Sequence, residues 1–167
     1  MNYHNITHDD MNNGDGLRVV LWVAGCEHHC KNCQNPVTWD IKGGIPFDGQ
    51  ALKEIQTELE KEYISGITFS GGDPLHPANF PQILILLNWI HENFPGKTVW
   101  VYTGYTWEEV VSRIGLYTLS LIDVLVDGEF VEELKDINYH WAGSTNQRII
   151  DVKKSIKEGS VIPYVSH

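Results

Sequence analysis

Three cysteines crowd into one short stretch of the chain, GCEHHCKNCQNP, between Gly25 and Pro36. Cys26, Cys30 and Cys33 are all the cysteines that the protein contains, and their spacing is Cys-x₃-Cys-x₂-Cys. Three thiols cannot all pair as disulfides, and a structural zinc site usually takes four ligands. Thiolates suit iron–sulfur clusters, and three of them on a four-iron cluster leave one iron without a protein ligand. That iron could bind a small molecule directly.

Two alternatives explain the same cysteines without a cluster. A zinc site would recruit His28 or His29 as its fourth ligand, although structural zinc sites typically use paired Cys-x₂-Cys units. Three inert core cysteines are the other alternative, but such cysteines rarely crowd into a polar loop. We expect both histidines to face solvent instead of binding a metal.

The bulk composition is typical of one globular domain, which we expect to span residues 1–167. The chain is 42% hydrophobic and 20% charged, with a net charge of −10. The acidic balance argues against nucleic acid as a partner, because that binding depends largely on Lys and Arg. No apolar run approaches the ~20 residues of a membrane span, and the N-terminus does not resemble a signal peptide. We therefore expect a cytoplasmic protein, where clustered cysteines more often bind metal or act in catalysis than form disulfides.

Strands and helices are predicted to alternate around the cysteine loop. The valine-rich run Leu17–Ala24 predicts a buried strand that leads directly into the loop. Further strands are predicted near residues 67–70, 97–104 and 122–128, and helices near 47–63, 80–94 and 106–114, with Asp48 and Thr106 as N-caps. Residues 147–165 predict a final strand, a turn near Glu158–Ser160 and a last short strand. Such alternation indicates βαβ units and a mostly parallel sheet.

Residues of types that are least typical of an apolar core follow the ends of four predicted strands. They are the cysteine loop, Ser70–Asp73, Thr103–Tyr105 and Asp127–Gly128. The carboxyl ends of parallel strands share one rim of the sheet, and ligands bind at that rim. We therefore expect these four segments to lie together.

The cysteine spacing after the first predicted strand resembles the signature of the radical S-adenosylmethionine (SAM) enzymes. Within that superfamily, the chain resembles the activating subunits of anaerobic (class III) ribonucleotide reductases, over about residues 13–154. The stretches that carry this resemblance are NGDGLRVVLWVAGCEHHCKNCQNPVTW, ITFSGGDPLHP, GKTVWVYTGYTWEE, VLVDGEFV and GSTNQRIID. The spacing alone indicates only the superfamily, whereas the ordered set in so short a chain indicates the family.

The resemblance implies a fold, cofactors and partners. The fold would be an incomplete (β/α) barrel of the radical SAM type, with a mostly parallel sheet of four or five strands and an open side. Cys26, Cys30 and Cys33 would hold a [4Fe-4S] cluster whose open iron is chelated by SAM. Reductive cleavage of SAM would yield a 5′-deoxyadenosyl radical, which takes a hydrogen from a glycine of the large catalytic subunit of the reductase. A reduced flavodoxin-type protein is the implied electron donor.

The resemblance also implies positions that bind SAM. Ser70–Asp73 matches the motif that holds the methionyl amino group, since glycines allow a close backbone approach and a carboxylate suits an ammonium. Asn32 stands where relatives contact the adenine, and Gln34 stands where they often have an aromatic residue. The full implied set is Asn32, Cys33, Gln34, Ser70, Gly71, Gly72, Asp73, Thr103 and Asp127. The chain departs from the family pattern at Asp15, in a stretch that usually reads Gly-Pro-Gly. It departs again at Ala142, where relatives often have an arginine whose role Arg148 could take.

Two other functions remain open. Another small radical SAM enzyme, such as an activase of the pyruvate formate-lyase type, would share the cysteines and the mechanism, but the GSTNQR stretch fits it less well. A non-enzymatic zinc- or cluster-binding interaction module would explain the cysteines. It would not explain Gly71-Gly72-Asp73 at the end of a strand.

Overall fold

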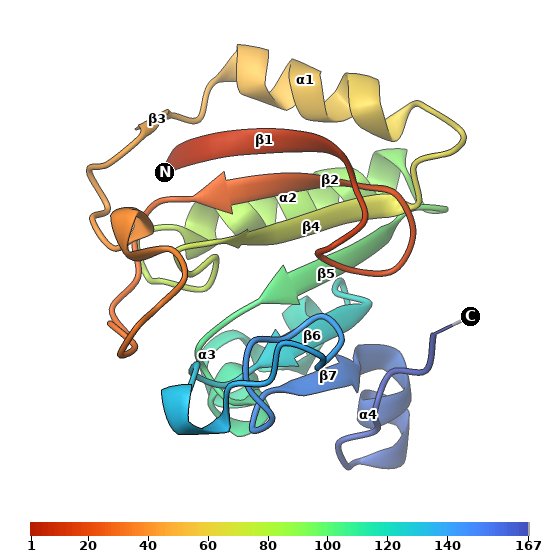
Figure 1. Ribbon diagram of the computed structural model, residues 1–167. Coiled ribbons are helices and arrows are strands. Elements are labelled where there is room, and N and C mark those ends of the chain that lie inside the picture. The colour runs from red at the N-terminus through yellow and green to blue at the C-terminus, as the bar shows by residue number, and fades with distance from the viewer. Residues whose placement is uncertain (167) are drawn as a thin grey trace.

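A seven-stranded mixed sheet organises the chain in the computed structural model, which describes residues 1–166 (Figure 1). The strands are β1 (Asn2–Asp10), β2 (Arg18–Val23), β3 (Ile45–Pro46), β4 (Gly66–Gly71), β5 (Thr98–Tyr102), β6 (Val124–Asp127) and β7 (Arg148–Asp151). The helices are α1 (Gly49–Leu59), α2 (Phe80–Asn93), α3 (Trp107–Leu119) and α4 (Val152–Glu158), with 3₁₀ turns η1 (Pro36–Thr38) and η2 (Glu132–Leu134). Within this part of the chain, no helix is long and apolar enough to cross a membrane.

The centre of the sheet is parallel and its edges are antiparallel. The strand order is β3-β1-β2-β4-β5-β6-β7, and β2, β4, β5 and β6 run parallel as the alternating pattern predicts. β1, β3 and β7 pair antiparallel with their neighbours. The expectation of four or five strands was therefore wrong, because β1 and the two-residue β3 extend one edge. Over residues 1–166 the sheet is open, with β3 and β7 as its outer strands.

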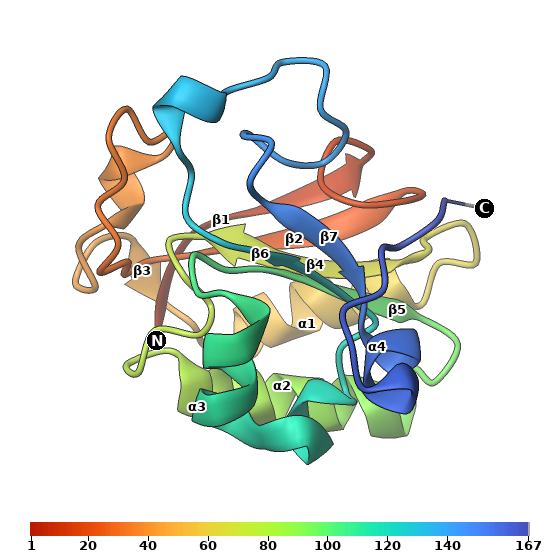
Figure 2. The same ribbon diagram turned by 90° about the horizontal axis from the view of Figure 1, so that it is seen from below.

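The two faces of the sheet have different coverings. Side chains alternate between the two faces along a strand. Val99 and Val101 of β5 therefore lie in the larger apolar core, which includes the helices, and Trp100 lies on the other face. Figure 2 shows the helices gathered on one side of the sheet and the segment 128–147 crossing the other side. Trp141 of that segment packs edge-on against Trp100, with ring centroids 5.0 Å apart. One face of the sheet thus packs against the helices in the core, and the other face is covered by loop segments.

The N-cap side chains of α1 and α3 lie where the sequence predicts them. The Asp48 side chain accepts a hydrogen bond from the Ala51 N–H at 3.0 Å, and Thr106 forms a capping box with Glu109. Both predicted N-caps are confirmed.

The C-terminal region differs from the prediction. β7 is the expected strand, but α4 follows it at once, with the Asp151 side chain accepting from the Lys154 N–H. The helix ends at Gly159, whose φ of 72° suits a glycine C-cap and confirms the expected turn. The last predicted strand is reduced to one bridge between Ile150 and Pro163.

Candidate functional site

The loops that follow β2, β4, β5 and β6 meet at one rim of the sheet, as parallel strands require. The Asp73 N–H donates to the Gly25 carbonyl at 2.6 Å, which joins the loops after β2 and β4. The Gly128 N–H donates to the Tyr105 carbonyl at 3.0 Å, which joins the loops after β5 and β6. The predicted convergence of the four segments is confirmed.

The three cysteines lie in the loop after β2 as free, partly buried thiols. The Asn35 N–H contacts Cys33 Sγ at 3.4 Å, and the Phe130 N–H, from the loop after β6, contacts the Cys30 sulfur. Burial raises the pKa of Cys26 to about 11, and the backbone N–H groups of His28 and His29 oppose that rise. N–H···S contacts of this kind stabilise thiolates, which are the form that binds iron. The donor set therefore fits an iron–sulfur cluster.

The two histidines of the loop have different environments. His29 is exposed, as expected, and stacks on Trp39 with ring centroids 4.5 Å apart. The expectation of a solvent-facing ring is wrong for His28, whose side chain is only 8% exposed. Its Nε2 lies 2.8 Å from Asp73 Oδ2 and its Nδ1 lies 2.7 Å from Glu129 Oε2.

These contacts bear on the zinc alternative. Both ring nitrogens of His28 are engaged by carboxylates, so neither is offered to a metal ion. In the described residues 1–166, no three His, Cys, Asp or Glu side chains converge closely enough to hold a single ion. Burial lowers the pKa of His28, but the hydrogen bonds to Asp73 and Glu129 outweigh it, and the net shift is upward.

Asp73 is the centre of the polar contacts at the rim. Its side chain is 1% exposed and accepts hydrogen bonds from the Leu75 and Gly104 N–H groups, at 2.9 and 3.0 Å. The Thr103 hydroxyl also donates to it, at 2.9 Å, in addition to His28. Thr103 thus lies beside Asp73, as two members of the implied set should. A cofactor amino group at Asp73 would have to share or replace one of these donors.

A cavity of about 580 Å³ opens beside the cysteine loop, on the face of the sheet away from the helices. Its lining includes Cys33, Gln34 and Ser70, which are three of the implied cofactor-binding residues. Aromatic and amide side chains complete most of the wall, namely Asn12, Asn13, Trp22, Asn35, Tyr102, Phe130, Tyr139, Trp141 and Gln147. Asn32 lies outside this lining and donates from its side chain to Glu132.

Tyr102 is one of several residues of this cavity that were not predicted from the sequence. Its hydroxyl oxygen is buried and has no hydrogen-bond partner among the described residues. An unpaired buried hydroxyl is costly, so a polar ligand in the cavity would relieve that cost. The alternation along β5, which places Tyr102 on the same face as Trp100, was the available signal.

Known proteins resemble this chain over most of its length. Residues 12–150 match the family model described as a 4Fe-4S single cluster domain. An anaerobic ribonucleoside-triphosphate reductase-activating protein from Salmonella typhi is 45% identical over 149 residues, which cover 88% of this chain and 96% of that protein. Proteins of the same name from Escherichia coli K12 and enterobacteria phage T4 are 45% and 42% identical, over 96% and 93% of their lengths. The chain belongs to this family.

Membership of the activating-protein family confirms the resemblance drawn from the motifs, and the domain match supports an iron–sulfur cluster. The matched residues 12–150 contain all three cysteines and every lining residue of the large cavity. The cysteine loop and the cavity therefore belong to the part of the chain that the family shares.

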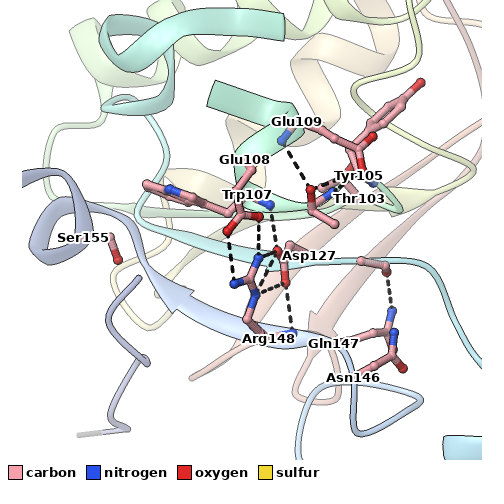
Figure 3. Close-up of polar contacts among 12 residues, drawn as sticks. Thr103, Tyr105, Trp107, Glu108, Glu109, Asp127, Asn146, Gln147, Arg148 and Ser155 are labelled. Atoms are coloured by element: carbon pink, nitrogen blue, oxygen red, sulfur yellow. Dashed lines mark hydrogen bonds and ion pairs between the residues drawn. The ribbon is translucent and has the colours of Figure 1, made fainter. Parts of the chain in front are cut away.

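Asp127, at the end of β6, has a different environment from the cavity residues. Its side chain is 1% exposed and accepts from the Trp107 N–H at 2.7 Å. Arg148 donates to it at 2.5 Å and to Glu108 at 2.9 Å, so Asp127 joins β6, α3 and β7 (Figure 3). The hydrogen bond from Arg148 holds the pKa of Glu108 below its usual range. A role of Asp127 at SAM, or of Arg148 at a partner, stays a prediction.

The two glycines of the turn after β4 permit a close backbone approach. Gly71 has a φ of +100°, and a Cβ there would lie 2.6 Å from the backbone of Val23. A Cβ on Gly72 would lie 2.4 Å from the Gly25 carbonyl oxygen. The glycines are therefore required by packing against the start of the cysteine loop, whatever ligand they also contact.

Replacing Gly72 by alanine is expected to displace the Gly25 peptide and to lower the free energy of unfolding by about 1–3 kcal/mol. Urea unfolding of the cluster-free protein measures this loss. Gly49→Ala is the matched control, since its Cβ would meet nothing within 4 Å at the start of α1. That substitution should be neutral or stabilising by up to about 1 kcal/mol. Equal destabilisation by the two substitutions would contradict the role given to the close approach.

Proposed function

We propose that this chain activates the large catalytic subunit of anaerobic ribonucleotide reductase by forming a glycyl radical on it, with a [4Fe-4S] cluster and SAM as cofactors. The observation that carries the proposal is the set of three free thiols at the sheet rim beside a cavity of about 580 Å³. The relatives described above are named as activating proteins of anaerobic ribonucleoside-triphosphate reductase, which supports the choice of the reductase as target.

The chain's own residues would bind and orient the cofactors. Cys26, Cys30 and Cys33 would hold the cluster, and the cavity that includes Cys33, Gln34 and Ser70 would hold SAM. Once bound, the two cofactors supply one-electron reductive cleavage of SAM to methionine, coupled to removal of a hydrogen atom from a glycine Cα of the partner. The aromatic wall would exclude water, which protects a radical from side reactions.

The remaining SAM contacts are proposed on the motif positions. Gly71 and Gly72 let the backbone approach the methionyl end, and Asp73 supplies the negative charge there. Asn32 would contact the adenine through its backbone. Thr103 and Asp127 would act from the ends of β5 and β6, at the rim that both strands share with the cysteine loop.

The proposal extends to fold type and setting. We propose one domain over residues 1–167, of the incomplete-barrel radical SAM type. The open sheet supports this type, because the cavity on the face opposite the helices could admit a loop of the large subunit. The electron would come from a reduced flavodoxin-type protein in the cytoplasm, without nucleic acid or membrane as partner.

The test is an anaerobic assay of the full chain. The protein is reconstituted with iron and sulfide, reduced and mixed with SAM, alone and with the large subunit. We expect 5′-deoxyadenosine and methionine, an EPR signal that changes when SAM binds, and a glycyl radical on the large subunit. A chain that keeps one zinc ion and forms no cluster would refute the proposal. A glycyl radical on pyruvate formate-lyase but not on the reductase would favour the alternative activase.

Tyr102→Phe is expected to change stability and cofactor binding in opposite directions. Removing the unpaired hydroxyl should stabilise the cluster-free protein by up to about 1 kcal/mol in urea unfolding. The same change should weaken SAM binding to the reconstituted protein by about 3–10-fold, measured by equilibrium dialysis, because one hydrogen bond is lost. Tyr117→Phe is the control, since Tyr117 is 78% exposed. Unchanged SAM binding in Tyr102→Phe would remove this residue from the site.

A further inference from the structure

One side chain joins the cysteine loop to two other loops of the rim. His28 lies between Cys26 and Cys30 in the sequence, and its two ring nitrogens face carboxylates on separate elements. Asp73, after β4, lies 2.8 Å from Nε2, and Glu129, after β6, lies 2.7 Å from Nδ1. A single imidazole thus links the loops after β2, β4 and β6.

The ring of His28 occupies a fitted slot. A Cβ on Gly104 would lie 2.5 Å from His28 Cδ2, so only glycine leaves room for the ring there. Tyr105 packs edge-on against the ring, with centroids 4.5 Å apart and planes at 70°. The anchor is itself fixed, since Asp73 is 1% exposed and is held by Thr103 and by backbone N–H groups. The position of the imidazole is therefore determined from several sides.

The two side chains on either side of Cys30, His29 and Lys31, lack such a buried anchor. The His29 side chain is exposed, and its ring stacks on that of Trp39. Lys31 is 77% exposed and lies 3.8 Å from Glu132, a distance typical of a weak surface ion pair. Between Cys26 and Cys30, the exposed Glu27 accepts a hydrogen bond from the Tyr105 hydroxyl, and His28 is the side chain that is both buried and bonded to two other loops.

We propose that His28 is the positioning residue of the cluster loop, whose bridge between Asp73 and Glu129 fixes Cys26 and Cys30 relative to the rim and slows loss of the cluster. The inference rests on the proposed function, in which these cysteines hold the cluster. His28 acts through the placement of the cysteines and is not itself a ligand. Residues that orient metal ligands in this way commonly change metal affinity by about 10–100-fold when they are replaced.

The test compares neighbouring histidines in the full chain. Wild type, His28→Ala and His29→Ala are reconstituted anaerobically, and their iron and sulfide contents are measured. An iron chelator is then added, and loss of the cluster is followed by absorbance. We expect loss to be at least about 10-fold faster in His28→Ala and within about 2-fold of wild type in His29→Ala. The EPR spectrum of the reduced cluster should change in His28→Ala alone, which a purely structural role would not produce.

A second variant keeps the proposal testable should His28→Ala fail to fold. Glu129 is 54% exposed, so Glu129→Gln removes one charged end of the bridge without disturbing the core. We expect cluster loss several-fold faster than wild type. Equal rates in the two histidine variants, or an unchanged rate in Glu129→Gln, would overturn the positioning role. A wild-type chain that forms no cluster would instead refute the proposed function, and the inference with it, so the two failures are distinguishable.

Discussion

Replacing Cys30 by alanine is expected to abolish both the four-iron cluster and the cleavage of SAM. Only two thiolates would remain in the loop, and the proposed cluster depends on three. Cys30 is partly exposed and lies outside both apolar clusters, so the substitution removes a ligand and not a core contact. The variant should therefore fold and unfold like the cluster-free wild type. Iron and sulfide content should fall sharply, and 5′-deoxyadenosine should fall to the level of the control without protein.

Lys31→Ala provides the matched control for this experiment. It alters the neighbouring position in the same loop, and its side chain is 77% exposed. Cluster content and SAM cleavage should stay near wild type in this variant. Full production of 5′-deoxyadenosine by Cys30→Ala would show that Cys30 is not a ligand. It would also contradict the assignment of three cysteines as the ligands of the cluster.

The general location of the site was predictable from the sequence. Apolar runs that end in polar or glycine-rich segments identify the strand ends, and parallel pairing then brings those ends to one rim. Cys33, Gln34 and Ser70 reach one cavity for that reason.

The burial of His28 was not predictable in the same way. Its two partners, Asp73 and Glu129, are 45 and 101 residues away in the sequence. No local pattern reports that both carboxylates come within hydrogen-bond distance of one ring. The unpaired hydroxyl of Tyr102 is similar, because the absence of a partner is a property of the whole fold.

The missed elements of the fold have local causes. β1 spans nine residues, of which only Ile6 is buried, so it lacks the apolar pattern that reveals a central strand. Its place in the sheet depends on backbone pairing with β2 and β3. α4 has seven residues and begins directly after β7, with Asp151 serving as the last strand residue and as the N-cap. A helix of this length is too short for the spacing of its apolar residues to identify it in the sequence.

The end of β2 opposite the cysteines carries a fully buried cation. Arg18 is 0% exposed, and each N–H of its guanidinium has an acceptor. Nε donates to the Thr68 hydroxyl at 2.9 Å, and Nη1 donates to the Asp15 carbonyl and the Thr98 hydroxyl at 2.9 and 2.8 Å. Nη2 donates to the carbonyls of Ile67 and Thr98 at 2.9 and 2.8 Å. Burial lowers the pKa of Arg18 to about 10, so the group stays charged at neutral pH.

Replacing Arg18 by methionine is expected to lower the free energy of unfolding by about 3–5 kcal/mol. Methionine fills much of the volume but supplies no donor to the oxygens that now surround the guanidinium. Urea unfolding of the cluster-free protein measures the loss. Arg113→Met is the control, because Arg113 is an exposed residue of α3 whose guanidinium lies 4.0 Å from the centroid of the Tyr105 ring. That contact is worth about 0.5–1 kcal/mol at an exposed site.

The Arg18→Met and Cys30→Ala variants together separate the residues that stabilise the fold from those that bind the cluster. Arg18 begins β2, whereas the cysteine loop follows the other end of the strand. The folded fraction of Arg18→Met should therefore bind iron and sulfide as wild type does, whereas Cys30→Ala should lose the cluster and keep its stability. Equal stability losses from Arg18→Met and Arg113→Met would mean that the buried hydrogen-bond network does not hold this end of the sheet together. A loss confined to Arg18→Met, with cluster assembly kept, would place stability and chemistry at opposite ends of the same parallel strands.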